Sequence, residues 1–133
     1  MKMRYSRRGF TLIEIMIVMT IISILVSIAV PMYQKAIVRA KESLLRSNLF
    51  TIRNMIDEYT VDKQKAPQTL QDLVTEGYLR DVPVDPMTGN NTSWKLIMED
   101  AAASIDQREP GIFDVRSGSE KTSPLDGSAY AEW

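Results

Sequence analysis

The sequence contains no cysteine and no histidine among its 133 residues. Without these residue types the chain cannot form disulfide bonds, Cys/His zinc sites, a Ser-His-Asp triad or a cysteine nucleophile. It also lacks a glycine-rich phosphate-binding loop. These absences exclude many enzyme classes, and we expect a protein that is not an enzyme. The lack of cysteine does not identify a compartment, because exported proteins can also lack disulfides.

Charge is unevenly distributed, although the net charge is only −1. Residues 1–9 carry four basic side chains and no acidic one, and residues 10–30 contain a single ionisable residue. Residues 31–65 carry seven basic and four acidic side chains, whereas residues 66–133 carry five basic and twelve acidic ones. The pattern indicates a basic leader, an apolar segment, a mildly basic stalk and an acidic head. It does not match a uniformly basic nucleic-acid surface, so no nucleic-acid partner is expected.

The apolar segment runs from Phe10 to about Met32. Its length matches the roughly 20 residues that a helix needs to span a bilayer. Basic residues before it favour a cytoplasmic N-terminus. The bias is less one-sided than usual because three basic residues follow it: Lys35, Arg39 and Lys41. A cleaved secretory signal peptide is the alternative, since Ser27-Ile28-Ala29 resembles a small-x-small cleavage site.

Glu14 interrupts this apolar segment. A carboxylate at the centre of a membrane helix costs about 2.5–3.5 kcal/mol on insertion scales, so it usually has a partner or a function. A signal-peptide core has no use for such a group. The simpler alternative is that Glu14 lies near the membrane interface and reaches water.

The junction Arg7-Arg8-Gly9-Phe10-Thr11-Leu12-Ile13-Glu14 resembles the type IV prepilin motif. The resemblance joins the basic leader, the glycine, the phenylalanine, the glutamate and the apolar run in a fixed order. It implies cleavage after Gly9 by a prepilin peptidase on the cytoplasmic face and N-methylation of the new terminal Phe10. The apolar segment would then stay on the protein, unlike an ordinary signal peptide.

The residue types of this junction have a physical rationale. Gly9 has no side chain, so a protease can approach its carbonyl closely. Cleavage creates an ammonium group at Phe10, and inside lipid this group and the carboxylate of Glu14 each need a counter-charge. In a helical stack, Glu14 of one subunit can meet the Phe10 amine of a neighbour, which neutralises both and sets the axial register. The prepilin resemblance implies this role for Glu14 and Phe10.

The helical pattern continues beyond Pro31, which lies where pilins have a proline and where it can kink or locally melt the helix. A helix from Phe10 to about Asp62 would be roughly 80 Å long. One stripe at helical spacing predicts core packing: Leu45, Leu49, Ile52, Ile56 and Tyr59. An upstream stripe has no obvious domain to pack on and is expected to face neighbouring subunits: Tyr33, Ile37, Ala40 and Leu44.

The remaining sequence predicts a small α+β head. The long helix should end near residues 63–66, before Pro67. A short helix should follow Thr69 as N-cap, with Asp72 in its first turn and Gly77 as its left-handed stop. After it, Tyr78 and Leu79 are expected to pack back on the stalk. Two short strands are expected at 94–98 and 112–115, and residues 116–133 should form an ordered loop closed by Tyr130 and Trp133.

Segments of this head resemble the major pseudopilin of type II secretion, general secretion pathway protein G. The similar positions are Leu73, Gly77-Tyr78-Leu79, Pro83, Asp85-Pro86, Gly89, Phe113-Asp114-Val115, Ser117-Gly118-Ser119, Leu125-Asp126-Gly127 and Trp133. The match is partial, because Met87 and Thr88 stand where the family pattern is closer to Trp-Gly. The resemblance implies a pilin-like fold in which a long N-terminal helix packs against a small antiparallel sheet with a C-terminal loop.

The expected organisation has four segments: a leader at 1–9, a transmembrane and filament-core helix at 10–32, an amphipathic stalk helix at 33–65, and a periplasmic head at 66–133. The resemblance implies a single-pass protein of the bacterial inner membrane with a cytoplasmic N-terminus and a periplasmic filament. Implied partners are further copies of the chain, minor pseudopilins, the prepilin peptidase/N-methyltransferase, the inner-membrane assembly platform with its ATPase, and membrane lipid before assembly.

Members of this family generally bind one calcium ion in the C-terminal loop. The resemblance implies Ser117, Glu120 and Asp126 as candidate ligands here, since calcium takes about six to eight oxygens. The loop has fewer aspartates than the family pattern, and Glu120 stands where aspartate is commoner. Solvated loop acids are the alternative. Neither reading involves an EF-hand motif.

Three functions remain in competition on these observations. The first is a major pseudopilin whose periplasmic filament drives folded proteins through an outer-membrane secretin. The second is a type IV pilin of a surface pilus, used for adhesion, motility or DNA uptake, and the missing cysteine pair counts against it. The third is a membrane-anchored periplasmic enzyme or binding protein, which would need a polar constellation in a pocket.

Overall fold

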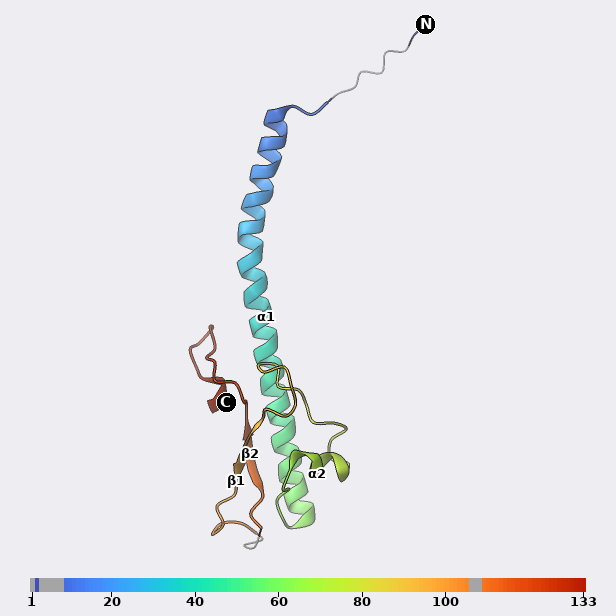
Figure 1. Cartoon of the computed structure of the whole chain (residues 1–133), viewed down its shortest axis with the longest axis vertical. Coiled ribbons are helices and arrows are strands. Elements are labelled where there is room, and N and C mark those ends of the chain that lie inside the picture. Colours follow the sequence, from blue (N-terminus) through green and yellow to red (C-terminus); the bar gives the residue numbers. More distant parts are fainter. Residues whose placement is uncertain (1, 3–8, 106–108) are drawn as a thin grey trace. The chain divides into compact units, whose positions relative to one another are not determined.

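The computed structural model describes residue 2, residues 9–105 and residues 109–133. Its elements are α1 (Leu12–Lys63), α2 (Leu70–Thr75), β1 (Lys95–Met98), β2 (Ile112–Arg116) and a 3-10 helix η1 (Tyr130–Glu132) (Figure 1). The chain divides into two compact units, Met1–Ile37 and Val38–Trp133. The predicted α+β class, with one long helix and a small antiparallel sheet, is confirmed.

The helix α1 has clear start and stop signals. At its start, the Thr11 hydroxyl accepts a hydrogen bond from the Glu14 N–H at 3.3 Å, which satisfies one of the donors that a helix end leaves open. Pro31 lies inside α1, and the helix continues through it. At the other end, Gln64 takes a positive φ of 55°, a left-handed conformation that terminates helices. The helix therefore ends where the sequence predicts.

The second unit has its own hydrophobic core. The α1 residues at helical spacing are all buried: Leu45, Leu49, Ile52, Ile56 and Tyr59. They pack against α2, the loop after it, β2 and the chain end, through Leu70, Leu73, Val82, Trp94, Ile112, Val115 and Tyr130. The predicted packing of the later stripe of the stalk is thus confirmed.

The short helix α2 is held at both ends by the residues that the sequence indicates. The Thr69 side chain accepts from the Asp72 N–H at 3.2 Å, and the Asp72 carboxylate accepts from the Thr69 N–H at 2.9 Å. This reciprocal capping box satisfies two helix-terminal donors. Gly77 takes φ 84°. Tyr78 then returns to the stalk, with its ring centroid 5.4 Å from that of Tyr59.

The sheet consists of β1 and β2 paired antiparallel, with Leu96 opposite Val115 and a register shift between Ile97 and Met98. Along β2 the inward residues Ile112 and Val115 are fully buried. Both strands begin within one residue of their predicted starts.

Candidate functional site

The junction between leader and apolar segment lies at the surface. Gly9 and Phe10 are exposed, and Phe10 is 79 % exposed. A Cβ atom added to Gly9 would meet nothing within 4 Å. The packing of the described chain therefore gives no reason for a glycine at this position. Arg7 and Arg8 of the predicted motif lie outside the described residues.

Glu14 lies in the first turn of α1 and is exposed. Within the described residues its carboxylate has no hydrogen bond or ion pair to another side chain. A carboxylate in the first helical turn is stabilised by the positive end of the helix dipole, worth about 0.3–1 kcal/mol at an exposed site. This gain is smaller than the cost of placing the charge in lipid.

The remaining polar groups of the apolar segment are satisfied within the helix. The hydroxyls of Thr20, Ser23 and Ser27 each donate to a backbone carbonyl three or four residues earlier, at 2.7 Å. Such bonding lets hydroxyl residues lie in an apolar environment without unpaired donors. Glu14 has the only charged side chain in residues 10–32.

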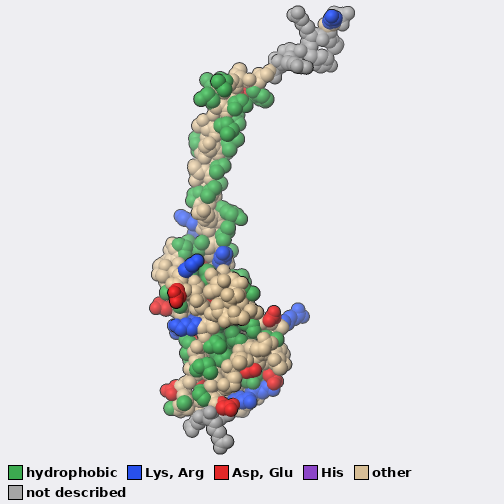
Figure 2. All heavy atoms as spheres, viewed as in Figure 1, with side chains coloured by type: hydrophobic (Ala, Val, Ile, Leu, Met, Phe, Trp, Pro, Cys, Tyr) green, Lys and Arg blue, Asp and Glu red, His purple; other side chains and the backbone are tan. Residues whose placement is uncertain are grey.

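The apolar side chains of this segment are exposed along its whole length. Leu12 is 80 %, Leu25 60 % and Met32 66 % exposed, and no residue in the most apolar stretch of α1 is buried. Figure 2 shows hydrophobic side chains over the N-terminal part of α1. By length and composition α1 can cross a membrane. Exposed apolar surface on this scale marks an interaction with lipid or protein.

The stripe expected to face neighbouring subunits is also uncovered. In the first unit Tyr33 is 69 % exposed, and in the second Leu44 is 51 % exposed. The next residue, Leu45, is completely buried in the core. One helix therefore presents a buried face and an exposed apolar residue one position apart.

The three candidate calcium ligands have different surroundings in the structure. The Ser117 hydroxyl is buried and donates to Asp85 at 2.7 Å. Glu120 is exposed. Asp126 accepts from the Ser128 hydroxyl at 2.6 Å and the Ser128 N–H at 2.9 Å. These two bonds, the hydroxyl first, lower the pKa of Asp126.

The three predicted side chains make a poor donor set for the ion. Among the described residues no group of three or more His, Cys, Asp or Glu side chains could hold a metal. Two of the three predicted ligands already have protein partners. No step of the proposed function is assigned to calcium, and the calcium expectation stays a prediction.

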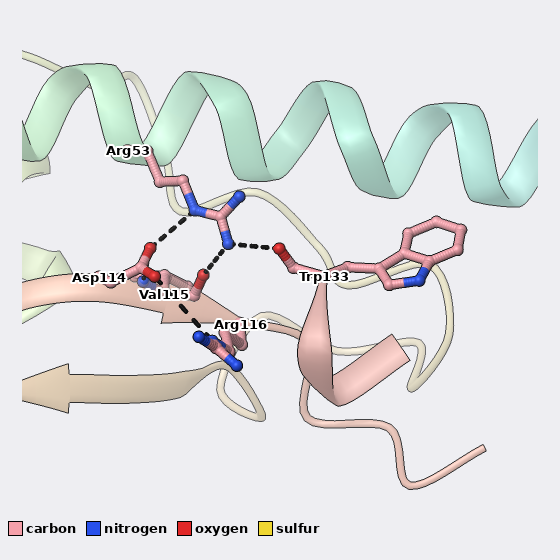
Figure 3. A network of polar contacts seen from close by, with 5 residues as sticks. All are labelled: Arg53, Asp114, Val115, Arg116 and Trp133. Carbon is pink, nitrogen blue, oxygen red and sulfur yellow. Dashed lines mark hydrogen bonds and ion pairs between the residues drawn. The ribbon is translucent and has the colours of Figure 1, made fainter. Parts of the chain in front are cut away.

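Sequence reasoning missed a polar cluster around Arg53, which joins α1 to β2 and to Trp133 (Figure 3). Its guanidinium donates to Asp114 at 2.7 Å and to the backbone oxygens of Val115 and Trp133 at 2.9 and 2.7 Å. The Arg46 guanidinium lies 4.2 Å from the centre of the Trp133 ring, a cation–π contact. The positions of Arg46 and Arg53 on α1 do not predict these contacts, because the partner residues are far away in the sequence.

Known proteins are similar to the N-terminal segment of this chain and to a longer region that includes part of the head. The profile of the prokaryotic N-terminal methylation motif matches residues 4–30. Type II secretion system core protein G of Klebsiella michiganensis is 34 % identical over 103 residues, covering 65 % of this chain and 72 % of that protein. The Escherichia coli protein of the same name is 32 % identical over 97 residues, covering 61 % and 67 %.

A second group of relatives matches a shorter region. Type IV major fimbrial protein FimA of Dichelobacter nodosus is 42 % identical over 66 residues, covering 50 % of this chain and 41 % of that protein. No solved structure matches significantly. The core protein G matches extend into the head, beyond the methylation motif. The chain belongs to the family of type II secretion system core protein G.

Proposed function

We propose that this chain is a structural subunit that polymerises through its N-terminal helix into a periplasmic pseudopilus, which drives type II protein secretion across the outer membrane. Family membership supports the proposal. The observation that carries it is an apolar helical segment that the chain itself leaves uncovered and that contains one carboxylate. The proposed role requires no catalytic residue.

Before assembly, residues 10–32 hold the subunit in the inner membrane with the head in the periplasm. A prepilin peptidase cleaves the Gly9–Phe10 bond and methylates the Phe10 amine. The open space around Gly9 supports this step, because packing within the described chain does not require a glycine at this position. Mass spectrometry of the mature protein should find N-methyl-Phe10 at its start. A mature terminus at Val30 would instead indicate an ordinary signal peptide.

In the filament, the Glu14 carboxylate pairs with the Phe10 ammonium of a neighbouring copy. Lipid offers neither group a counter-charge, so the carboxylate and the ammonium are neutralised only when two subunits meet. Glu14→Ala should therefore insert into the membrane at least as well as the wild type and yet assemble poorly. Ser23→Ala is the matched control, because Ser23 lies in the same apolar segment and its hydroxyl bonds only its own helix among the described residues.

Two measurements separate insertion from assembly. Membrane fractionation should find Glu14→Ala and Ser23→Ala in the inner membrane at equal levels. Shearing and sedimentation of overproduced filaments should recover Ser23→Ala but little Glu14→Ala. Filaments of Glu14→Ala at the wild-type level would refute the assigned role of the carboxylate.

A type IV pilin of a surface pilus is the second candidate, supported by the similarity to FimA. That similarity covers half of this chain, whereas the core protein G matches continue into the head. Both candidates use the same assembly chemistry, so variants of Glu14 do not separate them. Deletion of the gene does: loss of folded-protein secretion supports the pseudopilus, and loss of a surface fibre supports the pilus. Minor pseudopilins, an assembly platform and its ATPase are the partners of the first.

A further inference from the structure

We propose that two buried carboxylates, Glu42 and Asp85, close the C-terminal loop at residues 117–130 and that this closure needs no metal ion. The inference concerns the head alone and goes beyond the proposed filament function. It starts from the poor fit between calcium and the loop residues predicted to bind it. The same loop is instead rich in short-range and long-range hydrogen bonds, and two of its serines reach acids elsewhere in the chain.

Asp85 fixes the start of the loop. Its side chain is fully buried. One carboxylate oxygen accepts from the Ser117 hydroxyl at 2.7 Å and the Gly118 N–H at 3.1 Å, and the other accepts from the Met87 N–H at 2.8 Å. Three donors therefore replace the water that burial removes, which a buried carboxylate requires.

Glu42 fixes the far end of the loop from α1. Its side chain is 5 % exposed. The Ser123 hydroxyl donates to its Oε1, and the Tyr130 hydroxyl donates to the same atom at 2.9 Å. The Ser123 oxygen in turn accepts from the Leu125 N–H at 3.1 Å. A single carboxylate on the stalk thus organises both the turn after Ser123 and the aromatic residue that ends the loop.

The segment between these anchors closes on itself. The Ser123 N–H donates to the Ser128 carbonyl at 2.7 Å, and the Gly127 N–H donates to the Ser123 carbonyl at 2.8 Å. Gly127 has φ 76°, which a side chain would disfavour. The Asp126 carboxylate is used inside this turn by Ser128, whose hydroxyl also accepts from the Trp133 indole N–H at 2.7 Å. The turn is therefore satisfied by protein donors.

Calcium ordering and carboxylate ordering make opposite predictions. Calcium would draw about six to eight oxygens around one point. Here Asp85, Glu42 and Asp126 each accept from hydroxyl or amide donors of the protein, and the Ser117 hydroxyl donates to Asp85. In this loop serine hydroxyls stabilise the carboxylates, whereas in a loop rich in aspartate a bound cation would do so.

The first test compares melting of the full-length chain in detergent micelles with excess calcium and with excess EGTA. We expect the two Tm values to agree. A calcium site at a hundredfold excess over its Kd would instead raise Tm by about 10 °C for a domain of this size. A rise of that order, lost in Glu120→Ala or Asp126→Ala, would overturn the proposal.

The second test removes the anchors. Ser123→Ala and Glu42→Ala should lower Tm equally with calcium and with EGTA. Their matched controls are Ser43→Ala and Glu58→Ala, which change exposed residues of the same types on α1 and should leave Tm unchanged. If Glu42→Ala does not fold, Ser123→Ala carries the test alone. Equal Tm values for Ser123→Ala and its control would refute the anchoring role.

Local measurements separate loop closure from general stability. Hydrogen exchange of the amides in residues 117–130 should become faster in Ser123→Ala, while exchange of the α1 core stays slow. Glu42→Gln keeps the Oε1 acceptor for both hydroxyls and should restore most of the protection that Glu42→Ala loses. Exchange that rises evenly over the whole head in Ser123→Ala would contradict closure by this anchor.

Discussion

Leu44 and Leu45 are adjacent on α1, and changing each to alanine should impair a different property: filament assembly for Leu44 and stability of the head for Leu45. Leu45 is fully buried among core residues, whereas Leu44 is 51 % exposed. The two substitutions remove the same atoms from the same helix. Their difference therefore measures where each side chain lies and not the helix propensity of the new residue.

The magnitudes follow from these exposures. Truncating a fully buried leucine removes its transfer free energy and leaves a cavity, which costs about 2–5 kcal/mol. For a domain near 100 residues, this corresponds to a fall in Tm of about 10 °C or more. Truncating Leu44 in the free subunit should change stability by less than about 0.5 kcal/mol. In a filament that covers Leu44, the same change should weaken each subunit contact by about 1 kcal/mol.

Two assays are needed. Denaturant unfolding of the full-length chain in micelles measures the stability of the head, and sedimentation of sheared filaments measures assembly. We expect Leu45→Ala to lower the free energy of unfolding. Leu44→Ala should leave that free energy unchanged and lower only the yield of sedimented filaments. A Leu44→Ala chain that unfolds as easily as Leu45→Ala would refute the register of α1 on the head. Wild-type filament yield from Leu44→Ala would show that this residue faces solvent in the assembly.

Other residues of the head give further predictions. Arg53→Ala should cost about 1.5–3 kcal/mol of unfolding free energy, because it removes three hydrogen bonds made by a charged group; Arg53→Lys should recover only part, since lysine lacks the planar fork. Thr69→Ala should cost about 1 kcal/mol in the same denaturant assay through loss of the cap, with exposed Thr51→Ala as control. Burial and the Glu42 carboxylate raise the pKa of Tyr130 above its ordinary value of 10.0. The Tyr130 hydroxyl should therefore contribute its full stabilisation below pH 10 and lose it as the pH rises beyond that value. In melting curves recorded against pH, Tm should fall less steeply for Tyr130→Phe than for the wild type.

Most of the fold could be predicted from the sequence because it depends on local or periodic signals. The stripe from Leu45 to Tyr59 repeats at helical spacing, so it identifies both the helix and its buried face. Thr69 and Asp72 are three residues apart, which is the spacing of a capping box. Gly77 marks the left-handed stop in the same way. Each of these signals lies within a few residues of the structure that it specifies.

The polar anchors could not be predicted in this way. Glu42 lies among basic residues and looks like one more exposed charge of the stalk, and its partner Ser123 is 81 residues away in the sequence. Asp85 has the form of an ordinary Asp-Pro turn, and its partner Ser117 is 32 residues away. Nothing in the sequence distinguishes a buried acid from an exposed one when the donors that stabilise it come from another part of the chain. Asp126 differs, because its partner Ser128 is only two residues away, and its role as a calcium ligand stays a prediction.

The distribution of buried and exposed apolar residues on α1 also explains why one carboxylate can decide assembly in the proposed function. Residues 12–37 leave their apolar side chains uncovered, and either lipid or other copies of the helix can cover them with little difference in hydrophobic free energy. Apolar contact alone therefore gives weak preference for the filament. Glu14 supplies that preference, because lipid offers no counter-charge and a neighbouring Phe10 ammonium does. The cost of about 2.5–3.5 kcal/mol for a charge in lipid is then the approximate upper bound on what pairing contributes per subunit.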